Sequence, residues 1–232
     1  MDRITAALLA LVCALGGCAE GGSRGSGIST AVEGNVASVQ TALLSAPRAT
    51  RRERSGARLD FLAVETVARA TTAIEGIEVT IEGTTLHTET DAEGSFSLRG
   101  NFEGDVTLVF QRPDDGLMAR LAANVPAAGT LTLNNIHIDA TQGEASAETQ
   151  SAQFMGVITE VSCGDSIIIM RSVQQSPTDL DRYTVRLDTS ELRDSHGNAL
   201  SCGDLRGGEQ ALVQAQVNPD GTFGNGTVVV VD

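Results

Sequence analysis

The side-chain types of a catalytic triad stand next to one another in the segment Asp194-Ser195-His196. In a serine hydrolase the carboxylate orients the histidine and the histidine accepts the proton of the serine hydroxyl, so the three groups lie along one line. Consecutive residues cannot reach that line, and the following Gly197-Asn198 is typical of a turn. The segment therefore predicts a turn, and a hydrolase that uses His196 is the least favoured of the possible functions.

Longer catalytic and nucleotide-binding motifs are missing from the sequence. It has no nucleophile elbow, no His-Glu-Xaa-Xaa-His zinc motif and no phosphate-binding loop. With 30 Asp and Glu residues in the chain, no single pair of carboxylates indicates a glycosidase. We therefore predict no catalytic residue, no cofactor and no enzymatic activity.

The histidines and acidic residues of the sequence lack partners at metal-ligand spacing. His87 and His137 stand alone in strand-like stretches, and we interpret them as surface or packed histidines. Asp91, Glu93 and Asp114-Asp115 do not form the alternating acids of an EF-type calcium loop, so capping of turns is favoured. The sequence predicts no metal site.

An apolar run at residues 4–15 ends in Gly16-Gly17-Cys18. A membrane-spanning helix needs roughly 20 apolar residues, so this run has instead the length of a signal-peptide core. It resembles a bacterial lipoprotein signal peptide, in which small residues precede the cysteine that becomes lipidated. The resemblance implies that residues 1–17 are removed and that Cys18 carries the lipid. A plain secretory signal with cleavage nearby is the alternative.

The resemblance also implies a location. Two or more acyl chains anchor a protein stably to a membrane. Residue 19 is Ala, not the Asp that retains enteric lipoproteins in the inner membrane. We therefore expect an outer-membrane lipoprotein that faces the periplasm, with surface display as the other destination. Residues 18–30 are rich in Gly and Ser and predict a flexible tether.

The chain has four cysteines. Cys13 belongs to the signal peptide and Cys18 is the expected lipidation site, which leaves Cys163 and Cys202. In an oxidising compartment this pair predicts one disulfide, which stabilises a fold by about 3–4 kcal/mol for a loop of this size. Two cysteines without nearby histidines would form an incomplete zinc site.

Charge and composition exclude several classes of partner. The formal net charge of −14 repels the phosphates of nucleic acids and anionic lipid head groups. Aromatic residues make up 3% of the chain and Trp is absent, which argues against stacking platforms for bases or sugars. The sequence also has a local cluster of arginines. We interpret it as part of a solvated insertion and not as a patch that binds anionic ligands. Its members are Arg48, Arg51, Arg52, Arg54 and Arg58.

Residues 31–140 carry the alternating pattern of half-buried strands. Within them, residues 88–98 predict a hairpin, because Asp91 can accept hydrogen bonds in the turn and Gly94 can take a positive φ. The other strand-like stretches are residues 31–39, 76–83, 105–110, 131–133 and 136–138.

This region resembles the carboxypeptidase regulatory-like domains, small β-sandwiches of the transthyretin-like kind. The residues that carry the resemblance are 76–81, 90–98 and 104–108. In place of a short connection after the first strand, the chain has an Arg-rich insertion at residues 40–73. The resemblance implies a rigid spacer or accessory module.

Residues 141–152 are small and polar and predict a linker. Residues 153–232 return to strand patterns, with an Asp-Gly hairpin at 218–223. Five strands in such a length suit a closed barrel, which has no free sheet edges. The strand-like stretches are residues 154–161, 166–170, 183–188, 212–217 and 227–231.

This second region resembles small OB-like barrels found in exported bacterial proteins. The matching residues are 156–161, 183–188, 203–208 and 219–223. The family carries no assigned chemistry to transfer, and an OB-like fold does not by itself imply a ligand.

The sequence thus predicts an all-β protein, a transthyretin-like β-sandwich followed by a small OB-like β-barrel. We expect a non-enzymatic cell-envelope lipoprotein, held to the membrane by its lipid anchor, that presents two β-domains to an envelope protein or glycan. A secreted soluble protein that binds carbohydrate or protein is the alternative. Nucleic acid is not an expected partner.

Overall fold

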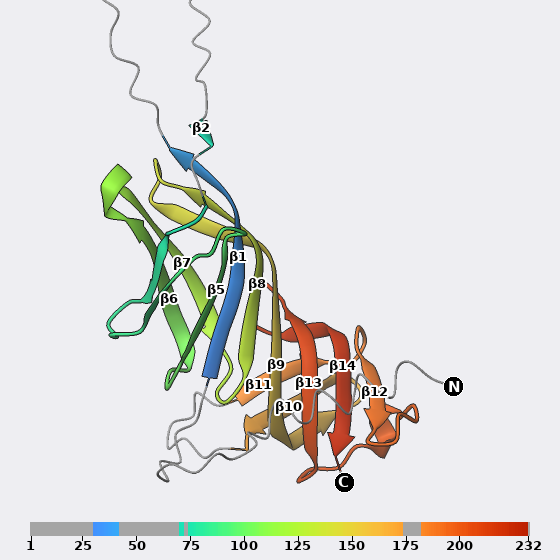
Figure 1. Cartoon of the computed structure of the whole chain (residues 1–232). Helices are drawn as coiled ribbons and strands as arrows, with labels where there is room; N and C mark the ends of the chain where they lie inside the picture. Colours follow the sequence, from blue (N-terminus) through green and yellow to red (C-terminus); the bar gives the residue numbers. More distant parts are fainter. Residues whose placement is uncertain (1–29, 42–69, 72–73, 174–181, 232) are drawn as a thin grey trace, which may run out of the picture.

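The described part of the chain is almost entirely β-structure (Figure 1). The computed structural model describes residues 30–41, 70–71, 74–173 and 182–231. Within these ranges helical geometry is limited to two 3-10 turns, η1 (Pro113–Asp115) and η3 (Cys202–Asp204). The prediction of an all-β fold is therefore confirmed.

Several sequence-based predictions fall outside the described residues. They are the signal peptide at 1–17, Cys18, nearly all of the tether at 18–30 and most of the Arg-rich insertion at 40–73. The two ends of the insertion are described, and they pair with each other as antiparallel strands, Gln40 with Thr71 and Thr41 with Ala70. The insertion therefore leaves and re-enters the fold at one place.

The first half of the chain forms a β-sandwich of two sheets. One sheet has the order β4-β3-β6-β7, and the other has the order β5-β1-β8-β9. The short strand β2 (Ala70–Thr71) extends the end of β1. The other strands are β1 (Thr30–Thr41), β3 (Glu78–Ile81), β4 (His87–Glu89), β5 (Ser95–Gly100), β6 (Gly104–Arg112), β7 (Leu117–Val125), β8 (Thr130–Asp139) and β9 (Glu144–Ser162).

Every second side chain of each strand points into the space between the two sheets and fills it. Phe96 of β5 is buried, and its ring meets the ring of Phe110 on β6 edge to face, with centroids 5.9 Å apart. Gly34 lies opposite Phe96 on β1, and a Cβ atom at Gly34 would come within 2.9 Å of the Phe96 ring. The glycine thus leaves room for the aromatic ring, which covers the neighbouring backbone.

The long strand β9 belongs to both halves of the molecule. Its first part pairs with β8 of the sandwich, and its second part pairs with β13 and β10 (Figure 1). Residues 141–152 therefore form a turn and the beginning of a strand, and the prediction of a linker there is wrong. The inward residues Ala145 and Ala147 are small, so the stretch lacks the hydrophobic contrast by which sequence patterns identify a strand.

The second half of the chain closes into a ring of strands in the order β9-β10-β11-β14-β13-β9. The link between β11 and β14 is a single parallel pairing, Val185 with Phe223. The extra strand β12 pairs with β14. These strands are β10 (Ile167–Ser172), β11 (Arg182–Arg186), β12 (Glu191–Asp194), β13 (Gln210–Val217) and β14 (Phe223–Val231).

The predicted disulfide between Cys163 and Cys202 is present, with the Cα atoms 5.7 Å apart. Cys163 lies in the turn between β9 and β10, and Cys202 begins η3. The side chain of Asp204 caps this 3-10 turn, because its carboxylate accepts hydrogen bonds from the backbone N–H of Ser201 at 2.8 Å and from its hydroxyl at 2.6 Å. The bridge therefore ties the β9–β10 turn to the segment that leads into β13.

One hydrophobic core continues from the sandwich into the barrel. The rings of Phe154, Tyr183 and Phe223 cluster inside the barrel, with centroids 4.7 to 5.9 Å apart. The Tyr183 hydroxyl accepts a hydrogen bond of 2.7 Å from the backbone N–H of Ala127, in the β7–β8 connection of the sandwich. Burial of an aromatic side chain contributes about 1.5–3 kcal/mol. The two halves are thus joined by β9, by apolar contact and by a buried hydrogen bond.

We predict that Tyr183→Phe lowers the free energy of unfolding by about 1–3 kcal/mol, because it leaves the buried N–H of Ala127 without this acceptor while it keeps the ring. Urea unfolding followed by far-ultraviolet circular dichroism measures the change. Ser97→Ala, which removes an exposed hydroxyl, is the control and should change stability by less than about 0.5 kcal/mol. Equal stability of Tyr183→Phe and the wild type would contradict this role of the hydroxyl.

Candidate functional site

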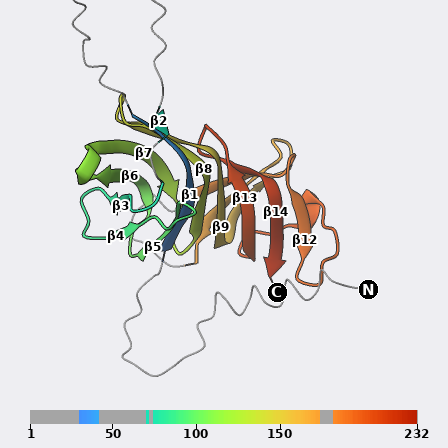
Figure 2. The same ribbon diagram turned by 45° about the horizontal axis from the view of Figure 1, so that its top comes forward.

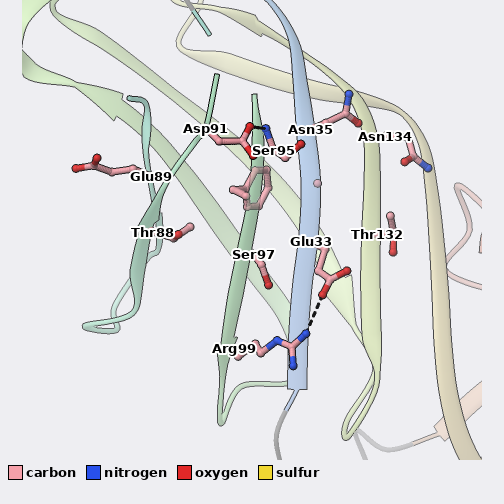
Figure 3. Close-up of a pocket in the computed structure, with 12 residues that line it drawn as sticks. Glu33, Asn35, Thr88, Glu89, Asp91, Ser95, Ser97, Arg99, Thr132 and Asn134 are labelled. Carbon is pink, nitrogen blue, oxygen red and sulfur yellow. Dashed lines mark hydrogen bonds and ion pairs between the residues drawn. The ribbon is translucent and has the colours of Figure 1, made fainter. Parts of the chain in front are cut away.

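The outward side of the sheet formed by β5, β1 and β8 carries a broad polar groove of about 660 Å³ (Figure 3). The alternation that buries Phe96 and Leu98 turns Ser97 and Arg99 outward, and the same rule exposes residues of β1 and β8. The side chains along the groove are those of Glu33, Asn35, Thr88, Glu89, Asp91, Ser95, Ser97, Arg99, Thr132 and Asn134. We call this set the polar groove.

Arg99 is the cation in the lining of the polar groove. Its Nη2 atom lies 3.2 Å from Glu33 Oε1 across the β5–β1 pair, as Figure 3 shows. Both side chains face solvent, with 70% of Arg99 and 41% of Glu33 exposed. An exposed ion pair contributes only about 0–1 kcal/mol to stability. Arg99 is therefore available to exchange this contact for one with a ligand.

The rest of the polar groove offers amide and hydroxyl groups. Asn134 donates from Nδ2 to Thr149 Oγ1 at 3.2 Å, and Asn35 Oδ1 accepts a hydrogen bond of 3.1 Å from the backbone N–H of Asn135. Asp91 already accepts hydrogen bonds from the backbone N–H groups of Glu93 and Ser95, so its role as a turn cap is confirmed. The chemistry that this lining supports is hydrogen bonding to a polar ligand.

A chain of hydrogen bonds crosses three strands on the same side of the sheet. Ser38 Oγ lies 2.7 Å from His137 Nδ1, and His137 Nε2 lies 3.1 Å from Glu148 Oε1. Asn135 also donates from Nδ2 to Glu148 Oε2 at 2.8 Å. The hydrogen bond with His137, followed by the one from Asn135, lowers the pKa of Glu148 below its ordinary value.

This chain of hydrogen bonds lies where the alternation of inward and outward side chains shifts by one residue in three strands. In β8 the buried positions change from odd to even numbers around Asn135, which has a φ of 52°. In β9 the inward positions also change from odd to even after Ala147, and β1 has register shifts between Gly34 and Ser38. The hydrogen bonds of His137 thus join β1, β8 and β9 at a shared bend.

The sequence predicts His137 to be a surface or packed histidine without a His or Cys partner at ligand spacing, and its half-exposed side chain hydrogen-bonds to Ser38 and Glu148. Its partners lie 99 residues before it and 11 residues after it, and only the pairing of the strands brings them together. The residue types are those of a hydrolase relay. However, the small pocket of about 190 Å³ beside His137 is not lined by Ser38. The arrangement supports a structural clamp.

The segment Asp194-Ser195-His196 forms the predicted turn after β12. Asp194 accepts hydrogen bonds from the backbone N–H groups of His196 and Asn198, at 2.9 and 2.7 Å, and from the Asn198 side chain at 2.7 Å. The Asn198 side-chain bond, above all, lowers the pKa of Asp194. Its carboxylate therefore caps the turn and does not orient the imidazole.

Within the described residues, no three His, Cys, Asp or Glu side chains are grouped so that they could hold a metal ion. His87 Nδ1 lies 3.2 Å from the backbone oxygen of Thr85. No helix in the described ranges is long and apolar enough to cross a membrane.

Comparison of the chain with protein families, with curated proteins and with solved structures finds no match in any of the three. The function must therefore be inferred from the residues and their geometry.

We predict that Glu148→Gln makes stability less dependent on pH in the acid range. The pKa of Glu148 is lowered by folding from its ordinary value of 4.5, so its carboxylate stabilises the fold above that pH, and this contribution is lost as pH falls through the lowered pKa. Urea unfolding between pH 3 and pH 7 measures the effect. Glu103→Gln is the control, and an unchanged pH dependence in Glu148→Gln would contradict the prediction.

Proposed function

We propose that this protein is a non-enzymatic lipoprotein of the bacterial cell envelope that uses its polar groove to bind an envelope glycan. The lipid is attached at Cys18, and the outer membrane, on its periplasmic side, is the proposed location. The support for this location is the sequence Gly16-Gly17-Cys18 after an apolar run, together with the disulfide Cys163–Cys202, which suits an oxidising compartment.

A scaffold role is supported by the way the two halves are joined. The strand β9 runs through both, and the core and the Tyr183–Ala127 hydrogen bond continue across the junction. A rigid body on a Gly- and Ser-rich tether can hold a binding surface away from the membrane in a fixed shape.

The single observation that favours a glycan is the lining of the polar groove. Amide, hydroxyl and carboxylate groups of Asn35, Asn134, Thr132 and Glu33, with one guanidinium from Arg99, match the many hydroxyl groups of a sugar chain. The proposed binding depends on hydrogen bonds, since the lining lacks Tyr and Trp and its one aromatic residue, Phe96, is 6% exposed. A protein partner is the other outcome that a test must distinguish.

The lipid anchor is tested by metabolic labelling with palmitate in a bacterial host. We expect the wild type to incorporate label and to fractionate with membranes, and Cys18→Ala to do neither, because a thiol at this position is the acceptor of the acyl chains. A wild-type protein that is exported but unlabelled would instead support the secreted, soluble alternative.

Glycan binding is tested by co-sedimentation of the protein with isolated peptidoglycan sacculi. We expect Arg99→Ala to weaken binding about tenfold or more, because a hydrogen bond from a charged donor contributes about 1.5–3 kcal/mol. Arg193→Ala is the matched control, since Arg193 also forms an exposed ion pair, with Glu191, but lies outside the polar groove.

Two results would overturn the glycan proposal. One is equal binding by Arg99→Ala and Arg193→Ala. The other is a combination of two observations: the wild type does not bind sacculi, and crosslinking in intact envelopes captures a protein through the polar groove.

A further inference from the structure

Two strand edges diverge beside the junction of the two halves. Strands β7 and β9 pair in parallel at one position, Arg120 with Glu144, where the Arg120 N–H donates to the Gly143 oxygen at 3.0 Å. Beyond this point the described residues show no further pairing between the two strands. Strand β7 keeps β6 on its other side and β9 keeps β8. Each strand therefore presents one edge to the space between them.

This space is a cleft of about 460 Å³. One wall is the edge of β7 at Ala122 and Asn124, and the other is the edge of β9 at Ala147 and Gln150. The hairpin between β13 and β14, residues 217–221, closes the barrel side of the cleft. The course of these strands can be followed in Figure 2. Both halves of the molecule thus contribute to the cleft.

The edge of β7 has free hydrogen-bonding groups along the cleft. In an antiparallel pair, alternate residues direct both backbone groups toward the same neighbouring strand. Arg120 directs its N–H away from β6, so Ala122 and Asn124 direct theirs the same way. No backbone partner on this side is found for either residue in the described part of the chain. Such an edge is a template for another strand.

The side chains at the cleft allow close approach of a backbone. Ala122 and Ala147 carry only methyl groups on the two walls. The third wall is held in shape by Asp220, which accepts hydrogen bonds of 3.0 Å from the Thr222 N–H and from Arg186 Nη2. The cleft is therefore formed before any ligand arrives, which limits the ordering cost of binding.

The charge of the cleft selects for a basic ligand. Asp105 and Glu148 line it, and its lining contains neither Arg nor Lys. Asp105 is held in place by Asn124, whose Nδ2 donates to Asp105 Oδ1 at 2.8 Å. An acidic site in a chain of net charge −14 attracts cationic side chains and repels anionic ones.

We propose that the cleft between β7 and β9 binds an extended, basic peptide segment of another protein, which adds as a strand to the edge of β7. The unpaired edge from Leu121 to Val125 suits a segment of about four to five residues, at roughly 3.3 Å per residue. Backbone hydrogen bonds to Ala122 and Asn124 provide the affinity, and Asp105 and Glu148 select Lys or Arg on the incoming strand.

Binding is measured by fluorescence anisotropy with the full mature chain and a labelled peptide of alternating lysine and valine. The critical variant is Ala122→Pro, which removes an edge N–H at a kind of position where strands tolerate proline. Met118→Pro is the matched control. The backbone N–H of Met118 points out of the same edge of β7, but Met118 is 48% exposed and lies outside the cleft. We expect Ala122→Pro to weaken binding at least tenfold and Met118→Pro to leave it within twofold.

Two more measurements separate strand addition from general attraction between opposite charges. A peptide of the same sequence with alternate backbone nitrogens methylated keeps its charge but cannot complete the ladder, and we expect it to bind at least tenfold more weakly. If Ala122→Pro does not fold, hydrogen exchange of the wild type takes its place, with slower exchange expected at Ala122 and Asn124 when the peptide is bound. Asp105→Lys should reverse the preference toward a glutamate–valine peptide.

The proposal is overturned by any of three results. These are equal binding of the methylated and unmethylated peptides, equal effects of Ala122→Pro and Met118→Pro, or no binding by the wild type. None of these results depends on Cys18 or on the polar groove, so they leave the proposed function unaffected.

Discussion

The fold depends on the requirement that one strand, β9, supplies apolar side chains to both the sandwich part and the barrel part of one continuous core. Its first part faces the sandwich with Ala145 and Ala147, and its later part faces the barrel with Phe154 and Ile158. A regular strand directs every second residue to one side, but the inward residues of β9 change from odd numbers at Ala147 to even numbers at Ala152, so the strand is irregular between them. The change occurs where β8 changes phase at Asn135, which keeps the two strands paired.

The chain of Ser38, His137 and Glu148 has a structural explanation at this bend. A change of phase in adjacent strands weakens the regular ladder, and side-chain hydrogen bonds from β1 to β8 to β9 hold the three strands together there. The residue types are those of a hydrolase, but the geometry gives them a different use. Residue types alone do not identify an active site, because the same groups also satisfy structural needs.

The same junction explains where ligands have access. The sandwich buries its apolar residues between two sheets, which leaves the outward side of β5, β1 and β8 polar and forms the polar groove. Because β9 bends away toward the barrel, it separates from β7 after one pairing and leaves two edges unpaired. The polar groove and the cleft are thus separate surfaces with different chemistry, one suited to hydroxyl groups and the other to a backbone.

Local patterns in the sequence determined the all-β class, the turns at 91–94 and 194–198 and the disulfide, because alternation, turn residues and the count of cysteines act over short distances or by elimination. The prediction of a hairpin at 88–98 is wrong, because the strands on either side of its turn pair in different sheets, β4 with β3 and β5 with β1. Only the tertiary structure decided that residues 144–152 are a strand, since small side chains such as Ala147 give no hydrophobic contrast. It alone joined His137 to Ser38 and Glu148, and it alone opened the cleft beside Ala122. Strand pairing between distant segments creates these contacts, and the free energy that selects the pairing comes from burial of the whole core, which no local stretch of sequence specifies.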